Sequence, residues 1–225
     1  MPEAPAPSAS SDAPRRALRA DAERNRRLIL DAAVAVFAEH GLDAGVAEIA
    51  QRAGVGSATV FRRFPSKQDL IVAVVDARIA EMRDALDAAL DDADPWAGLV
   101  TAMEAVARLQ ARDRGLFEAI GGSVSGDEHL RERHAELLAS LDAIARRAKA
   151  AGMLREDAAA TDLPLLAAAA VSTCQVTGGS APELWRRYLG IMLDGLRPAA
   201  ATPLPVGPQT LEQILEAKAR AAAGE

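Results

Sequence analysis

The chain has 225 residues, half of them apolar and only 3% aromatic, so it can bury a sizeable core. Alanine and leucine dominate and runs of β-branched residues are missing, which predicts an all-α fold. A single cysteine, Cys174, excludes an internal disulfide, and the longest apolar run, 163–171, is far too short to span a membrane. We therefore expect a cytoplasmic globular protein.

The formal net charge of −6 is unevenly distributed along the chain. Residues 15–67 hold ten Lys and Arg against six Asp and Glu, whereas residues 68–225 hold sixteen against twenty-four. A polyanion-binding module joined to an acidic body would show this asymmetry. Chance fluctuation on a solvated surface is the alternative.

Four helices are predicted in the first ninety residues. Residues 1–20 are expected to form a disordered arm, because their first part consists mainly of Pro, Ala and Ser. Apolar residues at helical spacing then run from near Asp21 to the stop at Gly41. Two short helices follow, one ended by Gly54 and one from Ser57 to about Phe64, and Ser66 caps a long helix.

The remaining chain is predicted to form a helical bundle, with about nine helices in the whole protein. Glycine-containing turns separate helices at roughly 95–112, 113–121, 127–151, 158–178 and 182–196. A Pro-rich linker and a weakly amphipathic final helix occupy 198–225.

The stretch AGVGSATVFRRFPSK, residues 53–67, carries the most chemistry. A short helix, a glycine turn and a second short helix form the helix-turn-helix arrangement, whose second helix enters the DNA major groove. Val60 and Phe64 should face inward. Arg62 and Arg63 can pair with guanine or contact phosphate, of which phosphate is the safer assignment, and Lys67 suits a phosphate contact. An exposed basic turn between packed helices is the alternative to this interpretation.

Residues 27–75 resemble the DNA-binding domain of the TetR family of bacterial transcriptional repressors. The shared pattern comprises I-L-D-A-A, the F-A-E-x-G stop, the E-I-A second helix, A-G-V, T-V-F-R-R-F and P-S-K-x-x-L. The resemblance implies a helix-turn-helix domain over 21–66 and an effector-binding and dimerisation domain over 67–197. It also implies a homodimer that reads palindromic double-stranded DNA and, as a repressor, releases it when a small apolar or amphipathic effector binds.

The resemblance also implies roles for individual residues of the reading helix and its flanks. Thr59 and Lys67 match the family's phosphate contacts, and Phe61 stands where a tyrosine hydroxyl often touches phosphate. Arg63 replaces a common histidine, and Gly45 stands where Ser or Thr often caps the second helix. The full set of expected DNA-binding residues is Gly56, Ser57, Ala58, Thr59, Phe61, Arg62, Arg63 and Lys67.

In the body, apolar periodicity suggests inner bundle faces that could line an effector pocket, although core packing would explain the same residues. The candidate pocket residues are Trp96, Leu99, Met103, Phe117, Leu141 and Val171. By the resemblance, the last two bundle helices pair with a second copy. The expected interface residues are Leu166, Val171, Trp185, Tyr188, Leu189 and Met192.

Neither an enzyme nor a cofactor or metal site is expected. His129 and His134 are five residues apart and so do not share a helix face, and no P-loop, G-x-S-x-G or acid–base constellation occurs. The alternative function is a helical small-molecule-binding protein without specific DNA binding.

Overall fold

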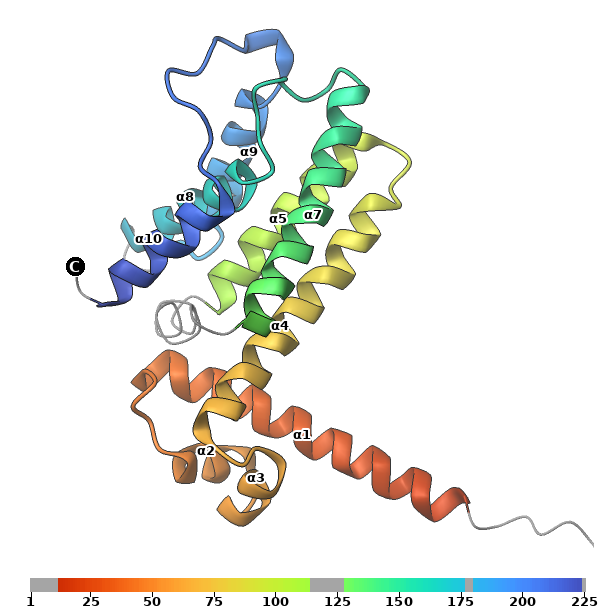
Figure 1. Cartoon of the computed structure of the whole chain (residues 1–225), viewed down its shortest axis with the longest axis vertical. Helices are drawn as coiled ribbons and strands as arrows, with labels where there is room; N and C mark the ends of the chain where they lie inside the picture. Colours follow the sequence, from red (N-terminus) through yellow and green to blue (C-terminus); the bar gives the residue numbers. More distant parts are fainter. Residues whose placement is uncertain (1–11, 114–127, 177–179, 224–225) are drawn as a thin grey trace, which may run out of the picture.

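The computed structural model describes residues 12–113, 128–176 and 180–223 of the chain (Figure 1). This part forms nine α-helices and one short 3₁₀ turn, Pro198–Ala200, without a strand, which confirms the predicted all-α class. The helices are α1 (Asp12–His40), α2 (Val46–Ala53), α3 (Ser57–Arg63), α4 (Lys67–Leu90), α5 (Pro95–Arg112), α7 (Glu128–Ala150), α8 (Asp162–Val176), α9 (Leu184–Gly195) and α10 (Leu211–Ala223).

The first helix begins earlier than the sequence suggested. The prediction placed its start near Asp21, whereas α1 begins at Asp12 and extends well beyond the other helices (Figure 1). Residues 15–20, RRALRA, are strong helix formers, and Pro14 falls in the first turn, where its missing N–H is tolerated. The predicted helix over 113–121 lies outside the described residues.

The first three helices and the first half of α4 share one core. Ile29 and Phe37 of α1, Ile49 of α2 and Leu70 of α4 are fully buried in it. Burial of these side chains stabilises the unit by roughly 2 kcal/mol for each large residue. The side chains fix the short α2 and α3, which are too short to be stable as isolated helices.

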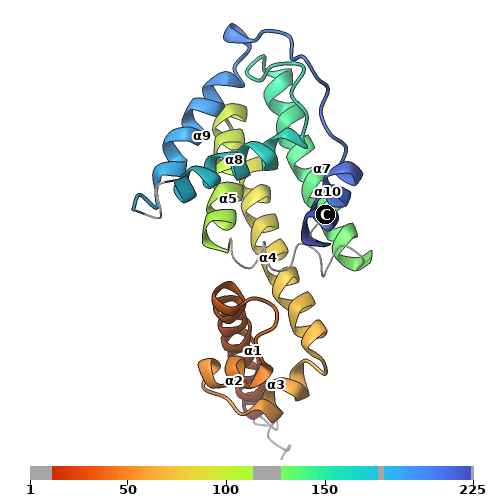
Figure 2. The same ribbon diagram turned by 90° about the vertical axis from the view of Figure 1, so that its left-hand side faces the viewer.

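Helix α4 joins this unit to the bundle. Its residues up to Ile79 belong to the N-terminal core, and from Met82 onward they belong to the bundle core. Leu130 at the start of α7 also packs into the N-terminal core. Figure 2 shows α4 running from the N-terminal unit into the bundle, so α4 is the main rigid connection between the two.

Helices α5, α7, α8 and α9 complete the bundle around a second core. Gly98 allows α5 to approach α4 closely, because a Cβ at this position would lie 2.4 Å from the carbonyl oxygen of Ala89. After α9 an exposed linker leads to α10, whose N-terminus is capped by reciprocal hydrogen bonds between Thr210 and Gln213. None of the helices in the described part of the chain combines the length and apolar character that a bilayer span requires.

Candidate nucleic-acid interface

The turn before α3 has the geometry that its glycines predict. Gly54 adopts a left-handed conformation with φ of 69°, and the backbone N–H of Val55 donates to the carbonyl of Ala50, 3.0 Å away. A residue with a Cβ would be strained by about 1 kcal/mol at this φ. The turn therefore sets the angle between α2 and α3.

Helix α3 is held by its inner face and presents its outer face to solvent. Val60 and Phe64 are buried in the N-terminal core, as predicted, and Val55 packs against the same core. On the other side, Ala58, Arg62 and Arg63 are exposed, and Phe61 retains 48% of its accessible surface. Ser57 and Thr59 are half-buried at the border between these faces.

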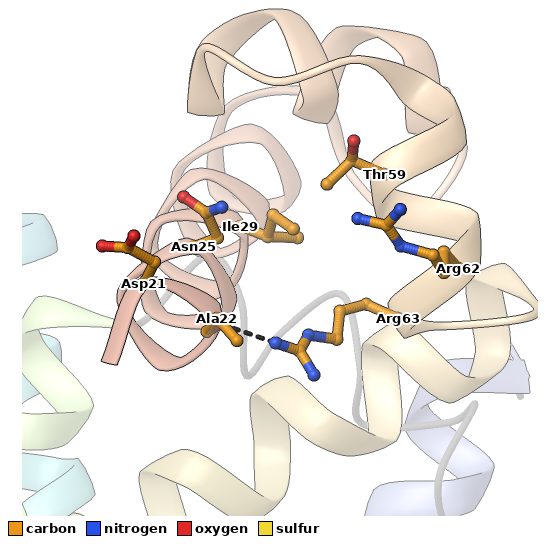
Figure 3. A pocket seen from close by; sticks show the side chains of 7 residues that line it. All are labelled: Asp21, Ala22, Asn25, Ile29, Thr59, Arg62 and Arg63. Carbon is orange, nitrogen blue, oxygen red and sulfur yellow. Dashed lines mark hydrogen bonds between the residues drawn. The ribbon is translucent and has the colours of Figure 1, made fainter. Parts of the chain in front are cut away.

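A groove of about 470 Å³ separates α3 from the N-terminal half of α1 (Figure 3). Ile29, which belongs to the N-terminal core, forms its apolar part. The other lining residues are Asp21, Ala22 and Asn25 from α1, and Thr59, Arg62 and Arg63 from α3. Thr59, Arg62 and Arg63, which were predicted to contact DNA, thus lie beside α1, for which no DNA contact was predicted.

Arg63, one of the predicted DNA-binding residues, makes a contact within the protein that the sequence did not indicate. Its Nη2 donates to the backbone carbonyl of Ala22 at 2.7 Å, which ties α3 to α1 across the groove (Figure 3). The two residues are 41 positions apart, so no local pattern signals the contact. Asn25 was also missed, although it lies one helical turn before the core residue Ile29 and so shares its side of α1.

The start of α4 supplies a second cationic position. Ser66 and Asp69 form the predicted N-terminal cap, in which the Asp69 N–H donates to the Ser66 hydroxyl at 3.1 Å and the Ser66 N–H donates to the Asp69 carboxylate at 2.9 Å. Lys67 follows directly and, within the described residues, has no ion-pair or hydrogen-bond partner for its amine. Free N–H groups and the positive helix end favour an anion here.

Gly45 precedes the first residue of α2 and provides no side-chain cap, as the sequence implied. Open space surrounds its Cα, because a Cβ there would meet no atom within 4 Å. At the other end of α2, Arg52 pairs with Glu39 of α1 at 2.5 and 2.7 Å. The hydrogen bond from Arg52 holds the pKa of Glu39 below its usual range, and the pair fixes α2 on α1.

In the bundle, four of the six candidate pocket residues lie in one buried cluster. These are Leu99, Met103, Leu141 and Val171. Trp96 packs against the same cluster under the guanidinium of Arg197, which lies 3.7 Å from the ring centroid. Phe117 lies outside the described residues.

The expected interface set needs a correction. Trp185, Leu189 and Val171 are buried within the chain itself, at 2%, 1% and 5% exposure, so they cannot offer a surface to a partner. Periodicity correctly placed these residues on apolar helix faces, but α8 and α9 use those faces to pack against the rest of the bundle. Leu166 and Met192 are half-buried, and Tyr188, at 38% exposure, is the one exposed residue of the six.

An exposed apolar surface nevertheless exists on the outer side of α8 and α9. Along α8 the exposed positions 165, 168, 169, 172 and 176 follow one helical stripe, and Val176 at its end is 90% exposed. On α9, Tyr188 and Ile191 are exposed beside Gly190.

Among the residues that the structure describes, no cluster of His, Cys, Asp and Glu could hold a metal ion.

Comparison with known protein families confirms the resemblance of residues 27–75. The model of the bacterial regulatory proteins of the tetR family matches residues 29–74. A second model, the C-terminal domain of SbtR-like transcriptional regulators, matches residues 94–198.

Individual proteins give the same result. The HTH-type transcriptional repressor LfrR of Mycolicibacterium smegmatis is 44% identical over 80 residues, which are 36% of this chain and 40% of that repressor. The TetR regulator SCO0520 of Streptomyces coelicolor has a TM-score of 0.61 and 33% identity, covering 78% of this chain and 99% of that structure. A TetR regulator of Mycobacterium vanbaalenii has a TM-score of 0.60 and 34% identity, covering 80% and 99%.

Proposed function

Because the chain belongs to the TetR family of bacterial regulatory proteins, we propose that it is a sequence-specific DNA-binding transcriptional regulator of the cytoplasm. The family consists of transcriptional regulators and not of enzymes. The relative LfrR is named a repressor, and we propose repression for this chain as well.

One observation carries the proposal. Arg62 on the exposed outer face of α3 and Lys67 at the start of α4 are cations without an ion-pair or hydrogen-bond partner in the described part of the chain. Unpaired arginine and lysine on one surface attract the phosphates of DNA. The small residues Gly56 and Ala58 would let the start of α3 approach base edges.

We propose a homodimer as the DNA-binding form. The exposed apolar surface of α8 and α9, with Leu165, Val176, Tyr188 and Ile191, is the surface that a second copy would cover. A dimer that reads a palindromic operator must hold its two reading helices about 34 Å apart, one turn of DNA. Ile191→Glu, which adds a charge to this surface, should convert the dimer to a monomer in sedimentation velocity runs.

We further propose that a small apolar or amphipathic effector binds in the bundle near Leu99, Met103 and Leu141, with Trp96, Val171 and Phe117 as further candidates. Since α4 belongs to both cores, an effector that repacks the bundle would move α4 and change the spacing of the reading helices. A coupling of about 1–3 kcal/mol is typical of such systems.

The test is a binding titration on the DNA that lies upstream of the protein's own gene. We expect a specific complex whose affinity falls steeply as salt rises, with unrelated DNA of equal length bound at least about a thousandfold more weakly. Equal affinity for both DNAs would contradict the proposal. It would favour the alternative, a helical small-molecule-binding protein without specific DNA binding.

A further inference from the structure

The groove between α1 and α3 has the chemistry of an anion site. Its polar side chains face one another from two helices, with Asn25 on α1 opposite Thr59 and Arg62 on α3 (Figure 3). Figure 3 shows the Arg62 guanidinium turned from α3 towards α1. Amide, hydroxyl and guanidinium groups can all donate hydrogen bonds to one acceptor.

These donors are not used within the protein. In the described part of the chain, the side chains of Asn25, Thr59 and Arg62 have no hydrogen-bond or ion-pair partner. Arg63 uses its Nη2 on the Ala22 carbonyl and keeps its remaining N–H groups.

The charge balance around the groove favours an anion. Asp21 is its one acidic lining residue, and the Asp21 carboxylate already accepts a hydrogen bond from Arg24 at 2.9 Å. Arg62 and Arg63 therefore leave the groove positive. Because the groove adjoins the exposed face of α3, the anion at hand is the backbone of the DNA that α3 reads.

We propose that this groove takes one backbone phosphate of the operator, with Arg62 and Thr59 from α3 and Asn25 from α1 as its hydrogen-bond donors. Arg63 is the positioning residue, because its bond to the Ala22 carbonyl ties α1 to α3 across the groove. Helix α1 thus becomes a third DNA-contacting element, beside α3 and the start of α4. This inference rests on the proposed function.

The decisive experiment pairs protein variants with operators that each carry one neutral methylphosphonate in place of a backbone phosphate. For the wild-type protein, we expect one position in each half-site at which the replacement weakens binding about tenfold. For Arg62→Met, replacement at that same position should weaken binding much less than in the wild-type protein, because the charged donor to this phosphate is gone. The slope of binding against salt concentration should fall by the amount expected for about one phosphate contact per half-site. The inference would be overturned if, at every phosphate position, the methylphosphonate weakened binding by the same factor in Arg62→Met as in the wild-type protein.

A second arm tests the share of α1 in the site. Asn25→Asp keeps the side-chain shape but adds a negative charge, and we expect at least about tenfold weaker operator binding. Gln51→Glu is the matched control, since it makes the same change in the last turn of α2, next to the Arg52 that pairs with Glu39 away from the groove. Equal effects of the two substitutions would remove α1 from the site.

The positioning role of Arg63 has its own measurement. In an Arg63→Met background α1 is no longer tied to α3, so Asn25→Asp should cost much less than in the wild-type protein. An unchanged cost would mean that Arg63 does not position α1. If no operator is bound specifically by the wild-type protein, the proposed function fails, whereas specific binding without any groove-coupled phosphate defeats this inference alone.

Discussion

Two sets of cationic side chains lie on the same chain and differ in what surrounds them. At α3 and the start of α4, Arg62 and Lys67 have no carboxylate partner in the part that the structure describes. In the middle of α4, by contrast, Arg78 and Arg83 are paired with carboxylates. The comparison shows that the partner, and not the charge itself, separates a cation that holds the fold from one that is open to a ligand.

The paired set forms a belt around α4 between its two cores. On one side, buried Asp113 pairs with Arg78 at 3.0 Å and Arg112 at 2.9 Å, and Arg112 also bonds Glu81 at 2.7 and 2.8 Å. On the other side, Asp76 pairs with His129 of α7 at 3.1 Å. The belt binds the end of α5 and the start of α7 to the helix that continues into the N-terminal unit.

The largest effect is expected where a paired cation loses its partner. Asp113 is 1% exposed, so Asp113→Ala leaves Arg78 and Arg112 without a buried counter-charge and should lower the free energy of unfolding by about 3 kcal/mol. Denaturant unfolding followed by circular dichroism measures this. The control is Asp142→Ala, whose partner Arg146 is exposed, as is Asp142 itself, and which should cost less than about 1 kcal/mol. Similar losses for both variants would remove the distinction between belt and surface pairs.

Loss of an unpaired cation should weaken DNA binding and leave the stability of the fold almost unchanged. Lys67→Ala removes no internal contact, so stability should change by less than about 0.5 kcal/mol. Operator binding should weaken by about 1–2 kcal/mol. The slope of log affinity against log salt concentration should fall by the amount expected for about one phosphate contact per half-site. A fluorescence anisotropy titration at several salt concentrations, run beside a thermal melt, gives both quantities. A loss of stability without a loss of affinity would assign Lys67 to the paired set.

Acid should weaken the belt, because one of its carboxylates has a lowered pKa. The hydrogen bond from Arg112, aided by the charges of Arg112 and Arg78, lowers the pKa of Glu81 from its ordinary 4.5. Because the pKa of Glu81 is lower in the folded protein than in the unfolded chain, its carboxylate stabilises the fold fully at pH values above 4.5. This contribution is lost as the pH falls through the lowered pKa of the folded state. Because Glu81 is half exposed, the effect should stay below about 1 kcal/mol. Unfolding of the wild-type protein and Glu81→Gln from pH 7 to pH 3 should show their difference shrinking below 4.5; a constant difference would contradict this assignment.

Local signals were sufficient for most of the fold. Gly54 and Ser66 marked the ends and starts of helices, since a left-handed turn and a capping hydroxyl act within four residues. What the sequence could not show were contacts between distant segments. The bond from Arg63 to Ala22 and the pairing of Arg78 with Asp113 depend on how α1 and α5 pack, and periodicity could not say which apolar face of α9 is covered.

The smallest expected effect is a gain on the unpaired surface. Phe61 is 48% exposed on the outer face of α3, at the position where the family often carries a tyrosine hydroxyl. Phe61→Tyr adds a donor without changing the buried side of the helix, and one hydrogen bond to phosphate should tighten operator binding about threefold. Stability should be unchanged, and affinity for unrelated DNA should rise by a similar factor because phosphates carry no sequence information. Weaker operator binding would show that the new hydroxyl finds no phosphate, because the ring packs against a sugar or a base at this position. In that case Arg62 and Lys67 already supply the phosphate contacts on this side of α3.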